Sequence, residues 1–180
     1  MLTDFLRPYL SKKLYAKIYQ IGLNLWPCIR GGAGRVVHIS EDFMNLRVRL
    51  SLSWRSRNLV GTIYGGSMYA STDPMFMLML MEILGNQYVV WDKGCTIRFK
   101  RPGKVTMFCD FQITDAMLAE IHKNLDEKSE HSFTWQVQYK DTQENVYAEF
   151  DKVLYVAKKS FYKEKLKSRS LENKSLISNT

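Results

Sequence analysis

The segment from Met68 to Leu84 would form a helix that is apolar on nearly every side. Such a helix is too apolar for a protein surface, so the rest of the chain has to surround it. It is also too short to cross a membrane, because the uninterrupted apolar run covers only Met75–Met81 and a span needs about 20 residues. Asp73 interrupts the segment, and a buried carboxylate is costly unless it is paired or hydrogen-bonded. The fold therefore has to enclose this helix and, if Asp73 is buried, provide partners for its carboxylate.

The sequence leaves two positions open for Asp73. An Asp before a Pro is a good helix start, with Asp73 as the N-cap and Pro74 at the first helical position. Alternatively, the helix begins near Gly66, Asp73 lies two turns inside it, and Pro74 removes one internal hydrogen bond and kinks it. The Gly65-Gly66 pair favours backbone shapes that other residues cannot adopt and a close approach to a ligand.

Two further helices and six strands are expected around this segment. Leucine and isoleucine at helical spacing predict an N-terminal helix from Thr3 to about Leu25, and Thr114 to His122 resembles a short capped helix. Alternating apolar and polar residues predict an antiparallel sheet with one covered face. Its strands are expected at residues 35–39, 45–54, 88–100, 105–113, 131–140 and 146–157.

This order of elements indicates the α+β class. A long antiparallel sheet folded around one hydrophobic helix is the compact way to bury both. We expect residues 1–157 to form one domain that includes the N-terminal helix, and residues 158–180 to be a basic, frayed C-terminal tail. The N-terminal helix most simply packs on the domain, and contact with a membrane surface is the alternative for a basic amphipathic helix.

The net charge of +8 would suit nucleic acid, a membrane surface or an anionic ligand such as coenzyme A. The basic residues form no nucleic-acid recognition motif, so we expect no nucleic-acid partner. The three cysteines, Cys28, Cys95 and Cys109, are odd in number and lack metal-binding spacing. We therefore expect free thiols, no metal site and a cytoplasmic location. The first residues have no basic region followed by an apolar core, so no signal peptide is expected.

Three features at fixed spacing resemble a known family. Asn58 lies in a loop, Tyr64-Gly65-Gly66 follows it, and Asp73 stands nine residues after Tyr64. The pattern is similar to that of the hotdog-fold acyl-CoA thioesterase superfamily, in which many members of the phenylacetyl-CoA thioesterase-like branch carry Asn, His-Gly-Gly and Asp. Tyr64 stands in place of the motif His, as in an uncharacterised bacterial branch with an aromatic residue there. The resemblance covers most of the chain and implies a hotdog fold, in which a long antiparallel sheet wraps around a central hydrophobic helix.

This resemblance implies a hydrolytic site shared by two subunits. Asp73 would attack the thioester carbonyl or activate a water molecule, and the sequence leaves both roles open. The Gly66 amide, at the start of a helix, would polarise the thioester oxygen, and Asn58 would orient the water or hold the carboxylate. On one helix Gly66 and Asp73 would lie roughly 10 Å apart along the axis, too far for one small reacting group. In the family, the Asp of one subunit faces the Gly-Gly amide of the other, so we expect a homodimer or a dimer of dimers.

Further residues are expected to bind the substrate. Tyr64 could place a hydroxyl near the thioester, but it cannot act as a base near neutral pH because its reference pKa is about 10. A methionine-rich wall could accept variable acyl chains, with core filling as the simpler role. A basic cluster at a strand end could hold the phosphates of coenzyme A, or be a solvated edge. The expected substrate-binding residues are Tyr64, Gly65, Ser67, Thr72, Met77, Arg98, Lys100 and Arg101.

The sequence thus predicts an acyl-CoA thioesterase that hydrolyses an acyl thioester to the free acid and coenzyme A. Coenzyme A enters as part of the substrate, and no other cofactor is expected. The alternative is a non-catalytic protein that binds acyl-CoA or an acylated carrier protein, in which Tyr64 marks lost chemistry. An acyl-carrier hydratase on the same fold usually relies on a His that this motif lacks.

Overall fold

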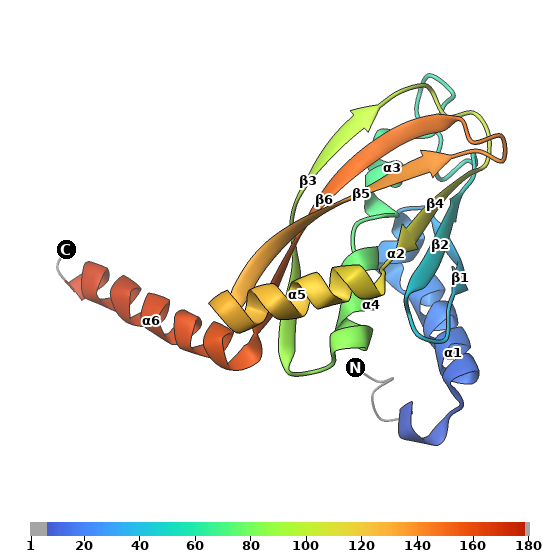
Figure 1. Ribbon diagram of the computed structural model, residues 1–180. Coiled ribbons are helices and arrows are strands. Elements are labelled where there is room, and N and C mark those ends of the chain that lie inside the picture. Colours follow the sequence, from blue (N-terminus) through green and yellow to red (C-terminus); the bar gives the residue numbers. More distant parts are fainter. Residues whose placement is uncertain (1–6, 179–180) are drawn as a thin grey trace.

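A six-stranded antiparallel sheet forms the body of the protein (Figure 1). The structure is a computed structural model that describes the backbone of residues 7–178 and the side chains of residues 7–170. The strands lie in the order β1-β2-β4-β5-β6-β3, so β1 and β3 are the two edges. They are β1 (Arg35–Ile39), β2 (Asn45–Leu50), β3 (Tyr88–Phe99), β4 (Met107–Gln112), β5 (Glu130–Lys140) and β6 (Val146–Lys158).

The helices surround and fill this sheet. Inside the curve of the sheet lies α4, whereas α1 runs beside β1 and α6 extends away from the body of the molecule (Figure 1). Among the described residues, no helix is both long and apolar enough to cross a membrane. The helical elements are a 3-10 turn at Arg7–Tyr9, α1 (Lys12–Leu25), α2 (Pro27–Gly31), α3 (Gly65–Ala70), α4 (Met75–Leu84), α5 (Asp115–Lys128) and α6 (Lys159–Ser178).

The core lies between α4 and the inner face of the sheet. Phe76 of α4 packs edge-on against Phe111 of β4 and Trp135 of β5, with 5.0 Å between ring centroids in each pair. Along β2 the buried and exposed residues alternate as the sequence predicts. This alternation directs the apolar side chains of each strand toward α4 and the polar ones away from it. The predicted sheet around a hydrophobic helix is thereby confirmed.

The apolar segment forms two helices rather than one. Its first part, α3, ends at Ala70, and a turn over residues 71–74 leads into α4. Proline has no backbone N–H and disfavours helical geometry in the residue before it, which explains the break at Pro74. The N-cap of α4 is Pro74, and no side chain caps this helix. Asp73 is therefore neither an N-cap nor an interior helix residue, and both positions considered for it were wrong.

Other element boundaries also differ from the expectations. The first α-helix begins at Lys12 because Ser11 caps it by accepting from the Leu14 N–H at 3.3 Å, and the expected start at residues 3–6 lies outside the described residues. Thr114 caps α5 as predicted, but this helix continues to Lys128. The segment expected as a frayed tail is helical up to residue 178, and lysine, glutamate and leucine within it are good helix formers.

One edge of the sheet is closed by side chains of α1. The Asn24 side chain donates to the carbonyl oxygen of Val36 at 2.8 Å and accepts from the Val36 N–H at 2.9 Å. Gln20 donates to the same carbonyl at 3.0 Å. Val36 of β1 thus makes both hydrogen bonds that a neighbouring strand would offer. No comparable pair of side-chain bonds reaches the backbone of β3, the opposite edge, among the described residues.

Candidate functional site

Asp73 is partnered by a buried lysine of β6. The Lys152 Nζ donates to Oδ1 of Asp73 at 3.2 Å and to the Asp73 backbone carbonyl at 2.9 Å. Lys152 is fully buried, whereas the Asp73 side chain is 42% exposed. The lysine therefore fixes both the turn between α3 and α4 and the carboxylate that this turn presents to solvent.

A second carboxylate lies on the inner side of Lys152. Asp92 of β3 approaches the Lys152 Nζ with its Oδ1 at 3.5 Å, and its side chain is only 16% exposed. This contact is an ion pair without hydrogen-bond geometry, so the Oδ1 has no hydrogen-bond partner among the described residues. Burial raises the pKa of Asp92 to about 6, against the opposing effect of the Lys152 charge. The Lys152 ammonium group is thus within ion-pair distance of two carboxylates, the partly exposed Asp73 and the more buried Asp92.

The ring of Tyr69, on α3, packs against the Lys152 ammonium group. The Lys152 Nζ lies 5.3 Å from the centroid of the Tyr69 ring, a cation–π distance. The neighbouring Asp73 carboxylate, followed by burial, raises the pKa of the Tyr69 phenol to about 12. The phenol therefore stays protonated near neutral pH and can donate but not act as a base.

The sequence contains a signal for Lys152 that our expectations did not use. Lys152 is in phase with the inward residues of β6, and Asp92 is in phase with Val90 of β3. Lysine is almost never fully buried unless it is paired, so a lysine on the apolar side of an alternating strand indicates an internal partner. The inward residues beside it on β6 are Ala148, Phe150, Leu154 and Val156.

Asn58 uses its side chain within its own loop. Its Oδ1 accepts from the N–H groups of Val60 at 3.1 Å and Thr62 at 3.0 Å, and its amide donates to the Thr62 hydroxyl at 2.8 Å. These three bonds hold the turn that precedes the glycine pair. In this arrangement Asn58 shapes the loop, and among the described residues its side chain makes no hydrogen bond to Asp73 or Lys152.

The glycine pair is required for space rather than for an unusual backbone. Neither Gly65 nor Gly66 is among the positions with positive φ. A Cβ on Gly66 would lie 2.2 Å from the ring of Tyr64, and one on Gly65 would lie 2.7 Å from the ring of Phe99. The two rings therefore lie directly on the first turn of α3, which is the position expected to face the thioester.

The other expected substrate-binding residues of this region, in α3, α4 and the turn between them, are buried or partly buried. Ser67 is buried, and Thr72 donates from its hydroxyl to the Tyr69 carbonyl at 2.9 Å. Met77 is partly buried against the core. Among the described residues, neither the Ser67 nor the Thr72 hydroxyl makes a hydrogen bond to Asp73.

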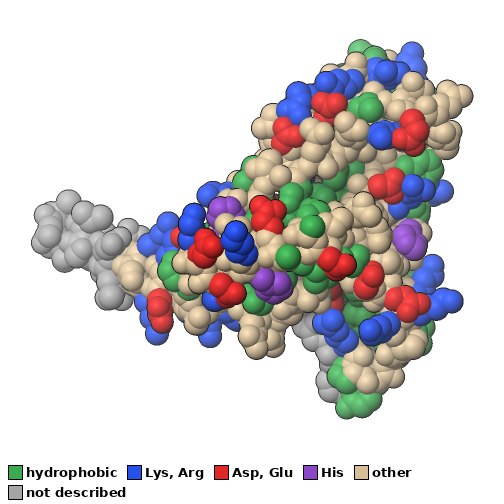
Figure 2. Space-filling model, viewed as in Figure 1, with side chains coloured by type: hydrophobic (Ala, Val, Ile, Leu, Met, Phe, Trp, Pro, Cys, Tyr) green, Lys and Arg blue, Asp and Glu red, His purple; other side chains and the backbone are tan. Residues whose placement is uncertain are grey.

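Two of the three basic residues expected to bind phosphates already have anionic partners. Arg98 donates to both oxygens of Asp151, at 2.8 and 3.0 Å, and Lys100 pairs with Glu149 at 3.0 Å. Arg101 donates to the side chain of Asn145 at 3.2 Å. Figure 2 shows basic and acidic side chains side by side over the ends of β3 and β6. The positive charge of Arg98 and Lys100 is therefore largely balanced within the sheet.

Solved structures with the same architecture include thioesterases and proteins of unknown function. A protein of Pseudomonas aeruginosa described as a probable thioesterase superposes with a TM-score of 0.69 at 15% identity, over 79% of this chain and 95% of the other. A thioesterase of Haemophilus influenzae gives 0.58 at 12% identity, over 79% and 90%. A mutant thioesterase of Staphylococcus aureus gives 0.52 at 11% identity, over 72% and 97%. These similarities confirm the hotdog fold predicted from the sequence.

The sequence comparisons place the chain in one family. No curated protein matches it. The model of a domain of unknown function, DUF4442, matches residues 16–156, which include the whole sheet up to Val156 as well as α3 and α4. The chain, a hotdog-fold protein with a lysine-held aspartate between its two central helices, therefore belongs to the DUF4442 family.

Proposed function

We propose that this protein hydrolyses an acyl thioester, with Asp73 as the group that attacks the carbonyl or activates water. The observation that carries the proposal is the presentation of Asp73: a half-exposed carboxylate held by a fully buried lysine at the break between α3 and α4. A structural aspartate at this place would be expected to cap α4, and this one does not. The thioesterase-fold neighbours agree with this reaction class.

Lys152 is assigned a positioning role in this reaction. Its two hydrogen bonds hold both the backbone and the side chain of Asp73. Holding a reacting group in one geometry lowers the barrier because less orientational freedom remains to be lost. Lys152 itself is buried beneath Asp73 and is not expected to touch the substrate.

The Gly66 amide is assigned to the thioester oxygen. The first amides of a helix have no partner inside the helix, and Tyr64, the N-cap residue, supplies no side-chain bond. An amide in this position can stabilise the negative charge that develops on the carbonyl oxygen. Because α3 and α4 are separate helices, the separation of roughly 10 Å that one continuous helix would give Gly66 and Asp73 does not apply.

The β3 edge of the sheet is a separate reason to expect a site shared by two subunits. This strand has 12 residues and forms one margin of the sheet. An unpaired edge strand can pair with a strand of another chain. Pairing two copies in this way would bring the β3 strands of both subunits, each of which carries Asp92, side by side. Exposed aromatic residues, Trp91 and Phe99, lie on this strand. We propose a homodimer formed through β3, with acyl-CoA as the substrate.

Turnover by an Asp73→Asn variant tests the chemistry. We expect this variant to fold but to lose at least about a hundredfold in turnover on an active acyl-CoA, the lower end of what a positioned acid–base group contributes. The screen covers acyl chain lengths and aromatic acyl groups. The control is Asp151→Asn, because Asp151 lies one residue from Lys152 on the outer face and pairs with Arg98. Wild-type turnover in folded Asp73→Asn would refute the assignment.

The second candidate is a non-catalytic acyl-thioester binding protein. Tyr64 favours it, because this residue replaces the histidine of the resembling motif and its ring lies on Gly66. The same screen separates the two functions. Binding of acyl-CoA without hydrolysis by the unmutated protein would favour the binding protein over the enzyme.

A further inference from the structure

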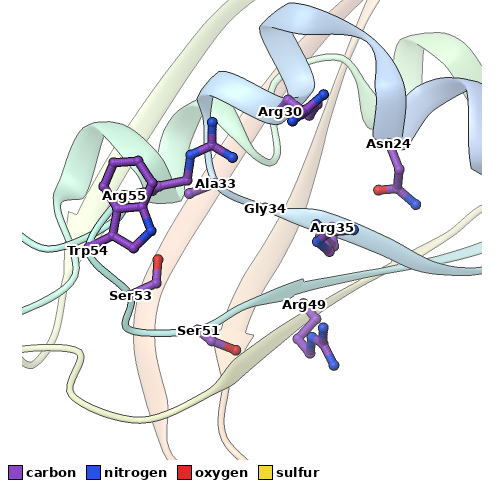
Figure 3. Close-up of a pocket in the computed structure, with 10 residues that line it drawn as sticks. All are labelled: Asn24, Arg30, Ala33, Gly34, Arg35, Arg49, Ser51, Ser53, Trp54 and Arg55. Atoms are coloured by element: carbon purple, nitrogen blue, oxygen red, sulfur yellow. The ribbon is translucent and has the colours of Figure 1, made fainter.

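A cavity of about 240 Å³ lies where α2, the start of β1 and the end of β2 meet. Figure 3 shows Arg35 and Arg49 near each other on adjacent strands, Arg55 and Trp54 on the loop after β2, and Arg30 on α2. These five residues all line the cavity. The cavity is separate from the Asp73 cluster, whose residues do not line it.

The charge of this cavity is one-sided. Four arginines line it, and no aspartate or glutamate does. Within the part of the chain that the structure describes, no carboxylate comes within ion-pair distance of any of the four. By contrast, Arg47 on the same outer face of β2 donates to Asp110 at 2.9 Å. The charge of Arg47 is therefore balanced by a carboxylate, whereas the charges of the four arginines in the cavity are not.

The position of two of these arginines is unfavourable without an anion. Arg35 and Arg49 are direct partners in the antiparallel register of β1 and β2. Like charges directly opposite each other destabilise a sheet, and arginine cannot lose its charge. A bound anion between them would turn this repulsion into attraction. The arginine fork matches the oxygen geometry of phosphate, which makes phosphate the anion of choice.

Trp54 adds an aromatic surface at the mouth of the cavity. Its side chain is 86% exposed, and the Arg55 guanidinium lies 5.2 Å from the ring centroid. An exposed indole face can stack a flat base. The cavity is smaller than the roughly 300–1,000 Å³ of pockets that enclose a whole small molecule, so only one end of a ligand fits inside.

We propose that this cavity binds the phosphate group of a nucleotide, with the base stacked on Trp54. Arg35, Arg49 and Arg30 hold the phosphate, and Arg55 lies between the phosphate and the ring. A free nucleotide and the nucleotide end of coenzyme A share this chemistry. The proposal does not depend on thioester hydrolysis, because it concerns a different surface of the molecule.

Titration calorimetry with inorganic phosphate, AMP, adenosine and coenzyme A tests this site at low ionic strength. We expect AMP to bind more tightly than phosphate, adenosine not to bind detectably, and added salt to weaken binding. The Arg35→Gln/Arg49→Gln double variant should bind AMP at least about tenfold more weakly, roughly the effect of one charge-assisted contact. Arg47→Gln is the matched control and should bind AMP like the unmutated protein.

Trp54→Ala tests the base. It should reduce the affinity for AMP to that for phosphate and leave phosphate binding unchanged. Competition between AMP and coenzyme A at this site would identify coenzyme A as a source of the nucleotide, and AMP binding without such competition would identify a free nucleotide; both results support the site. Undiminished AMP binding by the folded double arginine variant, or no binding of any phosphate compound at millimolar concentration, would overturn the proposal.

Discussion

Lys152 determines how the carboxylates of the candidate site are presented. An ammonium group in the interior is costly unless charges and hydrogen bonds surround it, and here Asp73, Asp92 and the ring of Tyr69 do so. The two carboxylates differ in exposure, so the same cation stabilises one group that faces solvent and one that does not. Because Asp92 is the more buried of the two carboxylates, its protonation should change the stability of the protein measurably.

We predict that Asp92 makes stability fall as the pH rises from about 4 to 6. Burial raises its pKa from 3.8 to about 6, so between these values the folded state binds a proton that the unfolded state has lost. The free energy of unfolding then decreases with pH across this window. In Asp92→Asn this contribution is absent, so the variant should gain stability relative to the unmutated protein by at most about 3 kcal/mol between pH 4 and 6.

Urea unfolding at several pH values measures this difference. The control is Asp151→Asn, which removes an outer-face carboxylate. Arg98 lowers the pKa of Asp151 below 3.8, so the contribution of Asp151 to stability changes only below about pH 4, and the difference between Asp151→Asn and the unmutated protein should stay nearly constant from pH 4 to 7. A constant difference in unfolding free energy between Asp92→Asn and the unmutated protein from pH 4 to 7 would contradict the prediction.

At the scale of elements, the turn between α3 and α4 is held from two sides. Lys152 of β6 holds it at Asp73, and Ser71 hydrogen-bonds the hydroxyl of Tyr139 of β5 at 2.7 Å. Gly34 lies so close that a Cβ there would be 2.3 Å from that of Ser71. The break in the apolar segment is therefore a packed feature of the core and not a loose connection.

We predict that Ser71→Ala destabilises the protein by about 1–3 kcal/mol. The Ser71 hydroxyl donates to the Ser67 carbonyl at 2.6 Å, so the Tyr139 hydroxyl has to donate to Ser71. Both side chains are fully buried, and the alanine leaves the tyrosine donor without an acceptor. Tyr139→Phe should cost less, because Ser71 keeps its bond to Ser67.

A double-mutant cycle checks this asymmetry by chemical denaturation. Ser71→Ala combined with Tyr139→Phe should be more stable than Ser71→Ala alone, since no unpaired donor remains. Additive losses in the double variant would show that the two hydroxyls act independently.

The sequence predicted the strands and most helices well, but it did not predict the break between α3 and α4. Alternation in β2 and β6 depends on neighbouring residues and can be followed along the chain. Lys152 and Asp73 are separated by 79 positions, so their contact depends on strand order and not on local pattern. The same reason explains the unbalanced arginines beside Trp54, because Arg35 and Arg49 meet only through the pairing of β1 with β2. The resemblance identified Asp73 and Gly66 but carried no information about their partners here.

At the scale of the whole molecule, the order of the strands could not be read from the sequence. Between β2 and β5 lies β4, and β3 pairs with β6 at the far edge, so neighbours in the sheet are often distant in the chain. The fold itself was predicted correctly because a nearly all-apolar helix permits few arrangements and because the Asn58, Gly65-Gly66 and Asp73 motif resembles that of a known family. The proposed dimer follows from which strand remains at the edge.

We predict a dimer at micromolar concentration, formed by pairing of two β3 strands. Sedimentation velocity should give a mass twice that of the 21.1 kDa chain. Hydrogen exchange should show protection along β3 both for amides bonded to β6 and for amides that point to the edge. A folded monomer whose edge-pointing β3 amides exchange rapidly would contradict the prediction.

The side chains that close the β1 edge also limit how far such association can proceed. Asn24 and Gln20 occupy the backbone groups of Val36 that an incoming strand would need, which disfavours extension of the sheet on that side. If both margins were open, copies could join head to tail into an open-ended fibril. With the β1 margin closed, the proposed pairing through β3 would use the same surface on both copies and would be complete at two chains. By occupying these backbone groups, Asn24 and Gln20 would disfavour aggregation by strand addition at β1.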